Sequence, residues 1–135
     1  AAAQAAREAA PELPLLAGGK SFGGRMTSQA AAEGVLTGVK GIVFLGFPLH
    51  PPDRPGTSRA DHLAKVSVPL LFLQGTRDEF APLERLRPIC ESLAPRATLH
   101  VIEGADHGFH VLKRSGRTDD EVLRELAQTV ASWTF

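Results

Sequence analysis

Short apolar runs and longer stretches of helical period follow one another along the chain. Residues 41–47 are apolar throughout, and a continuous run of this kind predicts a strand covered on both faces, as in a parallel sheet. Four strands are predicted, at 14–19, 41–47, 69–75 and 97–103. Because helical patterns separate these strands, the chain is predicted to be an α/β protein.

Five helices are predicted, at 1–10, 22–33, 59–66, 83–93 and from Thr118 onward. Gly34 is expected to cap the second, and Thr118 begins the last with a capping box to Glu121. The apolar stripe of this last helix is predicted to comprise Val122, Leu123, Leu126, Ala127 and Val130. The alternation of strands and helices predicts one domain, 1–135, with a right-handed, doubly wound parallel sheet.

A glycine-rich turn follows the first predicted strand. Gly19-Lys20-Ser21-Phe22-Gly23 fits G-x-S-x-G, the nucleophile elbow, which holds a serine on a sharp turn between a strand and a helix. We expect Gly19 and Gly23 to approach so closely that a Cβ on either would clash. The free N–H groups at the start of the helix favour an oxyanion beside Ser21, and the Phe22 N–H is the candidate donor.

The same residues also end a phosphate-binding loop of the form G-x-x-x-x-G-K-[ST]. That pattern requires a glycine five residues before Gly19, where Pro14 stands instead. Proline has no N–H group to offer a phosphate, so we prefer the elbow. ATP binding that depends on Lys20 would favour the alternative.

Three strand ends carry polar residues typical of nucleophilic catalysis. Ser21 follows the first strand, Asp78 the third and His107 the fourth. The carboxyl ends of parallel strands share one edge of the sheet, where active residues collect. The order Ser, Asp, His is that of the α/β-hydrolases. We therefore expect the His107 ring to lie between Ser21 and Asp78.

Histidine titrates near neutrality, so His107 is the candidate base for the Ser21 hydroxyl. Asp78 is assigned to orient the imidazole. Glu79 and Asp106 are rivals for that role, but Asp106 adjoins His107 in the sequence and is expected to point away from it.

Other polar residues have two interpretations each. Lys20 and Arg25 flank the serine and either bind a substrate carboxylate or are solvated. His50, in the proline-rich loop 48–58, either contacts substrate or is an exposed loop histidine. His110 is a second imidazole of the site or, as we prefer, packs in the loop near His107. Cys90 is predicted to be a core residue.

Composition excludes several classes of function. Fifteen basic residues balance fifteen acidic ones, which leaves no electrostatic footprint for nucleic acid or an anionic membrane. The single cysteine excludes an internal disulfide, and no Cys and His residues have metal-ligand spacing, so neither a metal nor a cofactor is expected. We expect a small-molecule acyl substrate and, in the absence of a targeting signal, a cytoplasmic protein.

Four motifs resemble one family: GGKSFGGRM (18–26), GFPLHPP (46–52), LQGTRD (73–78) and GADH (104–107). It is the α/β-hydrolase family of testis-expressed and non-specific-lethal-complex hydrolase-like proteins and bacterial dienelactone-hydrolase-like proteins. The resemblance extends from Leu13 to Trp133 and implies an α/β-hydrolase fold with Ser21, Asp78 and His107 at the triad positions. Ser21 stands where the dienelactone hydrolases themselves have cysteine.

The expected function is that of a serine hydrolase of the carboxylesterase type working through an acyl-enzyme. The alternative is a hydrolase-like scaffold used for binding. The family's sheet usually has about eight strands with the elbow strand near the middle. We therefore expect a fragment of about four parallel strands that lacks the N-terminal strands and the second oxyanion donor, and that is poorly active alone. The elbow strand would lie at an edge, open to self-association.

Overall fold

The computed structural model describes residues 1–133 and contains a four-stranded parallel sheet. Its strands are β1 (Leu16–Lys20), β2 (Gly41–Leu45), β3 (Leu70–Gly75) and β4 (Ala97–Ile102), hydrogen-bonded in the order β1-β2-β3-β4. The prediction of four parallel strands with the elbow strand at an edge is confirmed. The strands follow chain order without the reversal that a doubly wound sheet contains.

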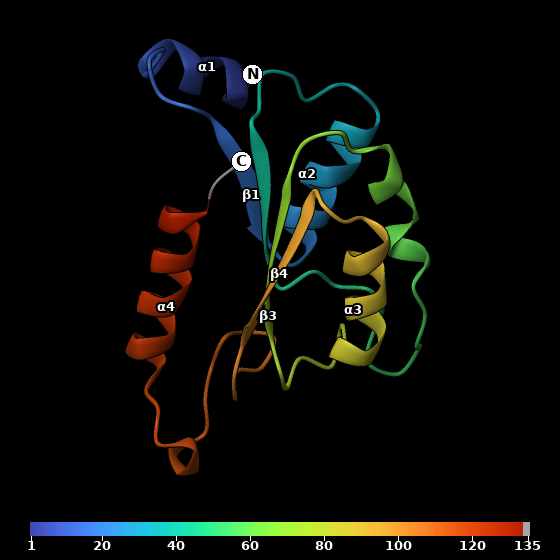
Figure 1. Ribbon diagram of the computed structural model, residues 1–135, viewed down its shortest axis with the longest axis vertical. Coiled ribbons are helices and arrows are strands. Elements are labelled where there is room, and N and C mark those ends of the chain that lie inside the picture. Colours follow the sequence, from blue (N-terminus) through green and yellow to red (C-terminus); the bar gives the residue numbers. More distant parts are fainter. Residues whose placement is uncertain (134–135) are drawn as a thin grey trace.

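Helices cover both faces of the sheet (Figure 1). They are α1 (Ala2–Ala9), α2 (Phe22–Ala32), η1 (Ser58–Lys65), α3 (Leu83–Ser92), η2 (Lys113–Ser115) and α4 (Asp119–Ser132). Helices α2, η1 and α3 lie on one face and α4 on the other. The segment predicted as an ordinary helix at 59–66 is the 3-10 helix η1.

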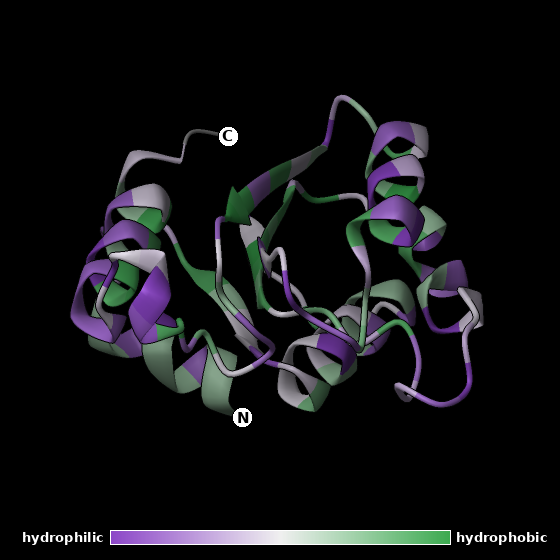
Figure 2. Ribbon diagram, turned by 90° about the horizontal axis from the view of Figure 1, so that it is seen from below, coloured by the Kyte–Doolittle hydropathy of each residue, from purple (hydrophilic) through white to green (hydrophobic). Residues whose placement is uncertain are grey.

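Successive strand residues divide the apolar core between the two faces. Phe44 and Phe72 face α2, η1 and α3, whereas Val43 and Leu71 belong to the cluster under α4. This follows from the period of two in a strand, which sends neighbouring side chains to opposite faces. Figure 2 shows hydrophobic segments of the strands between helices in which hydrophilic and hydrophobic residues are mixed. No helix within residues 1–133 is long and apolar enough to cross a membrane.

The first strand differs from its prediction. It begins at Leu16 and continues through the glycine pair to Lys20, whereas the sequence pattern placed it at 14–19. Its apolar residues are half-buried because, within residues 1–133, β1 has a hydrogen-bonded neighbour on one side only, β2. Self-association through this edge stays a prediction.

The last helix has a narrower apolar stripe than predicted. Val122 and Leu126 are buried, but Leu123 is 60% exposed and Ala127 is also exposed. The reason is that α4 contacts the sheet along a single line of side chains, so residues one position further round the helix face solvent. The Thr118 hydroxyl accepts a hydrogen bond from the Glu121 N–H, which confirms Thr118 as the N-cap. The reciprocal bond of the predicted capping box, from the Thr118 N–H to the Glu121 side chain, does not form among residues 1–133.

Candidate active site

Ser21 occupies a sharp turn between β1 and α2. Its φ and ψ angles are 52° and −121°, which place a non-glycine residue in the positive-φ region. Such strain costs about 1–3 kcal/mol and is concentrated at functional sites. The Ser21 N–H donates to the Leu45 carbonyl of β2, and its own carbonyl accepts from the Arg25 N–H. These bonds hold the turn between the sheet and the first turn of α2.

Two glycines permit the close passage of β1 and α2. A Cβ on Gly19 would lie 2.9 Å from backbone atoms of Gly23 and Gly24, and one on Gly24 would lie 2.6 Å from the Gly19 carbonyl oxygen. A Cβ on Gly23 would meet nothing within 4 Å. The steric prediction is therefore confirmed for Gly19 and wrong for Gly23, because Gly24 is the residue of α2 that faces the strand.

A pair of alanine substitutions tests this contact. Gly24→Ala is expected to destabilise the protein by about 1–3 kcal/mol, because the new methyl group overpacks against fixed backbone. Gly23→Ala is the matched control and is expected to be neutral or stabilising, since alanine is the better helix former. Urea unfolding measures both, and equal free energies of unfolding for the two variants would contradict the assignment.

The structure brings the three predicted residues into one hydrogen-bonded chain. His107 Nε2 lies 2.8 Å from Ser21 Oγ, and His107 Nδ1 lies 2.7 Å from Asp78 Oδ2. The predicted position of the His107 ring between Ser21 and Asp78 is thus confirmed. The Asp78 side chain is 1% exposed and that of His107 is 20% exposed, so the carboxylate is enclosed while the imidazole is reachable from solvent.

Gln74 fixes the Asp78 carboxylate. Its Nε2 donates to Asp78 Oδ2 at 2.7 Å and to the Ala81 carbonyl at 3.3 Å, while its Oε1 accepts from the Phe47 N–H at 3.1 Å. The second oxygen, Asp78 Oδ1, accepts from the Phe80 N–H at 2.8 Å. The sequence analysis missed Gln74, although it is the one polar side chain in the apolar run of β3.

The imidazole of His107 has a shaped environment. The Phe80 ring stacks on it, with centroids 4.2 Å apart. Gly46, just after β2, has a φ of 75°, and a Cβ there would lie 3.3 Å from His107 Nδ1. Both contacts restrict the ring's orientation, and neither was predicted.

Short loops carry Asp78 and His107, and hydrogen bonds join them. Thr76 Oγ1 accepts from the Gly104 N–H at 2.8 Å. Asp106 Oδ1 accepts from the N–H groups of Gly108 and His110, which closes the His107 loop on itself. Asp106 therefore shapes the loop, and it is Asp78 that is hydrogen-bonded to the imidazole. The other rival, Glu79, is exposed.

His110 lies outside the hydrogen-bonded chain. Its side chain is 70% exposed, and its Nδ1 lies 2.8 Å from Asp119 Oδ2. That hydrogen bond, together with the negative charge of Asp119, raises the pKa of His110. The expectation that His110 packs in the loop near His107 is wrong, because the ring turns toward α4. Lys20 is also exposed and lies near enough to His110 to oppose this rise in pKa.

His50 is 4% exposed, so its interpretation as an exposed loop histidine is wrong. Its N–H donates to the Phe80 carbonyl at 3.1 Å, which joins the proline-rich loop to the residue stacked on His107. Phe22 has a 64% exposed side chain and supplies the first N–H of α2, next to Ser21. The substrate-binding roles of Lys20, Phe22 and His50 stay predictions.

Cys90 is a core residue, as predicted. It is 6% exposed within the cluster under α3, and burial raises its pKa to about 12. The thiol is therefore protonated at neutral pH and does not compete with Ser21 as a nucleophile.

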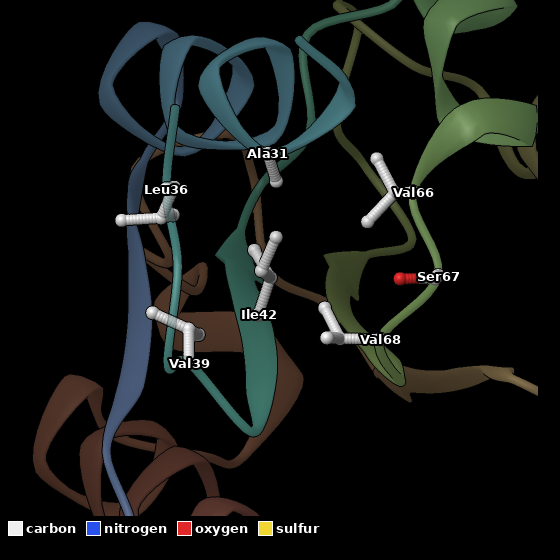
Figure 3. Close-up of a pocket in the computed structure, with 7 residues that line it drawn as sticks. All are labelled: Ala31, Leu36, Val39, Ile42, Val66, Ser67 and Val68. Carbon is white, nitrogen blue, oxygen red and sulfur yellow. The ribbon is translucent and has the colours of Figure 1, made fainter. Parts of the chain in front are cut away.

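Two hollows in the surface differ in their distance from Ser21 and His107. A small pocket of about 40 Å³ has a lining of Ala31, Leu36, Val39, Ile42 and Val66–Val68 (Figure 3). Ile42 lies near the start of β2, so this pocket is at the end of the sheet opposite to Ser21. A shallow polar depression of about 280 Å³ borders the His107 ring, with Arg77, Glu79, Phe80, Asp106 and Gly108 around it. Of these two hollows, the depression is the one that adjoins His107.

The sequence and the fold of the chain were compared with those of known proteins. Residues 1–135 match the sequence profile described as alpha/beta hydrolase domain. A putative alpha/beta hydrolase from Agrobacterium tumefaciens is similar over 96% of this chain and 56% of its own, with 20% identity and a TM-score of 0.65. An alpha-beta serine hydrolase homologue from Coxiella burnetii is similar over 91% of this chain and 54% of its own, with 20% identity and a TM-score of 0.61.

An a/b serine hydrolase without a lid from Xanthomonas campestris is 25% identical over 93% of this chain and 54% of its own, with a TM-score of 0.57. The chain thus spans about half the length of these solved structures. The first two likenesses, below 25% identity, concern the fold alone.

Proposed function

Since the chain belongs to the alpha/beta hydrolase domain family, we propose that it acts as a serine hydrolase on esters or related acyl compounds. The observation that carries the proposal is the continuous hydrogen-bonded chain from Ser21 Oγ through His107 to Asp78, with distances of 2.8 and 2.7 Å. A serine, an imidazole and a buried carboxylate in this sequence are the parts that nucleophilic acyl transfer requires.

In the proposed first step, Ser21 Oγ attacks the ester carbonyl carbon while its proton passes to His107 Nε2. A C–O bond forms and the carbonyl π electrons move onto the oxygen. When this tetrahedral intermediate collapses, the bond to the alcohol breaks and His107 returns the proton to the leaving oxygen. Asp78 holds the ring through Nδ1 and stabilises the imidazolium between these events.

The proposed second step releases the acyl group. Water attacks the Ser21 ester and gives a proton to His107, which then protonates Ser21 Oγ as the acid departs. The Phe22 N–H is the proposed donor to the oxyanion in both steps, because the first N–H groups of a helix have no intrahelical partner.

A fluorophosphonate probe tests this proposal on the full-length protein. Labelling of the native protein is expected, and Ser21→Ala is expected to abolish it. Ser92→Ala, at the exposed end of α3, is the control that keeps the label. A folded protein that takes no label would favour the alternative of a binding scaffold. If the native protein is labelled, hydrolysis of p-nitrophenyl esters of graded acyl length would define the preferred acyl group.

A further inference from the structure

Two arginines lie on the paired helices α2 and η1, and one of them, Arg25, is four residues after the proposed nucleophile. Arg25 is in the first turn of α2, where its N–H donates to the Ser21 carbonyl at 3.1 Å. Helical side chains lean toward the N-terminus of their helix, which is the direction of Ser21 from Arg25. Arg59 is in the first turn of η1, which packs against α2 (Figure 1). A hydrogen bond of 2.7 Å between Ser28 and His62 joins the two helices.

The two guanidinium groups have no anionic partner in the described part of the chain. Arg25 and Arg59 each come three residues before the members of the Ser28–His62 hydrogen bond, which joins α2 to η1. Burial, followed by the positive charge of Arg59, lowers the pKa of Arg25. Neither side chain forms an ion pair or donates a hydrogen bond among residues 1–133. Arg25 Nε is buried without a partner, while its outer nitrogens stay in reach of solvent. Two like charges held together without compensation are an arrangement that proteins tolerate at functional sites.

The other titratable neighbours do not neutralise this pair. Burial, followed by the charge of Arg25, lowers the pKa of His62, which favours the neutral imidazole. Asp61 partly opposes that shift, but its carboxylate forms no ion pair with Arg25 or Arg59 in the described residues. Two arginines and one aspartate give the cluster a net positive charge. Arg25 places this charge in the first turn of α2, the helix that follows Ser21.

We propose that Arg25 and Arg59 together bind an anionic group, a carboxylate or a phosphate, carried by the ester that Ser21 attacks. The forked guanidinium presents paired N–H donors that match either anion. This inference rests on the proposed hydrolase function and narrows its substrate class to esters that bear a negative charge near the scissile bond.

Two chromogenic esters of equal acyl length test the proposal with the full-length protein. p-Nitrophenyl butyrate is neutral, whereas mono-p-nitrophenyl succinate carries a carboxylate. The succinate ester is expected to have a kcat/KM about tenfold or more above that of the butyrate ester, because a hydrogen bond to a charged group is worth about 1.5–3 kcal/mol. Arg25→Gln and Arg59→Gln should each reduce this ratio by about tenfold, through KM for the succinate ester.

Lys65→Gln is the matched control, since it removes an exposed charge from the other end of η1. It should keep the ratio of the native protein. A ratio that is the same in the native protein and both arginine variants would overturn the inference while leaving the hydrolase function intact. Hydrolysis of neither ester by a folded protein would instead count against the hydrolase function.

Calorimetric titration of Ser21→Ala with glutarate and with inorganic phosphate tests the arginine pair without catalysis. Binding of either anion is expected, and its loss in the double variants Ser21→Ala/Arg25→Gln and Ser21→Ala/Arg59→Gln would support the pair as the ligand. The tighter anion distinguishes a carboxylate-bearing from a phosphate-bearing substrate. Binding of neither, or equal binding in all variants, would overturn the inference. Thermal unfolding of each variant verifies that it is folded.

Discussion

Replacing His107 with alanine is expected to lower kcat for a p-nitrophenyl ester by about three to six orders of magnitude. The imidazole lies 2.8 Å from Ser21 Oγ, and without it the hydroxyl proton has no acceptor within the hydrogen-bonded chain. KM should change far less, because the ring serves the reacting atoms and contributes little to ground-state binding. Steady-state kinetics of the purified variant measure both constants.

The same loop supplies the control for this substitution. His110 is three residues away, 70% exposed and hydrogen-bonded to Asp119. His110→Ala is therefore expected to retain kcat within about threefold of the native value, as for most exposed positions away from a reacting group. A larger loss of kcat in His110→Ala than in His107→Ala would contradict the assignment of His107 as the base.

The sequence pattern predicted elements where burial alone decides the residue types. β2 and β3 have apolar runs because both strands have neighbours on either side and helices above and below. The predicted burial was wrong in elements that have fewer neighbouring strands or helices. β1 is half-buried because it is an edge strand, and Leu123 is exposed because α4 has few contacts beyond its central line. The sequence pattern indicates which residues favour burial, and the position of each element in the fold decides how far they are buried.

The sequence predicted that Ser21, Asp78 and His107 come together, because each follows a strand whose end lies at the same edge of the sheet. It did not predict the contacts of Gln74, Phe80 and Gly46. Their contacts with Asp78 and His107 depend on the register of β2 against β3, which pairs Leu45 with Leu73 and so places Gly46 and Gln74 just beyond paired residues. Register of this kind is set by the whole sheet, so a local motif does not contain it.

Replacing Asp78 with asparagine is expected to lower kcat by about 10⁴, with the protein still folded. The carboxylate accepts three hydrogen bonds, from His107 Nδ1, the Gln74 amide and the Phe80 N–H. An asparagine amide has only one acceptor oxygen. If that oxygen takes the place of Oδ1 and keeps the bond from the Phe80 N–H, the NH₂ group takes the place of Oδ2 and faces Nδ1. It then holds the proton on Nε2, which is the tautomer that cannot accept from Ser21.

Gln74→Leu separates this tautomer effect from a loss of positioning. Leucine removes the donor to Asp78 Oδ2 and leaves the Phe47 N–H and one carboxylate lone pair unsatisfied, which costs about 1–3 kcal/mol of stability. The acceptor for His107 Nδ1 remains, so kcat is expected to fall by about 10–100-fold, well short of the loss in Asp78→Asn. Urea unfolding and kcat across pH 6–9 measure the two effects. Equal kcat losses in the two variants would mean that Asp78 acts by packing alone and that its charge has no part in orienting His107.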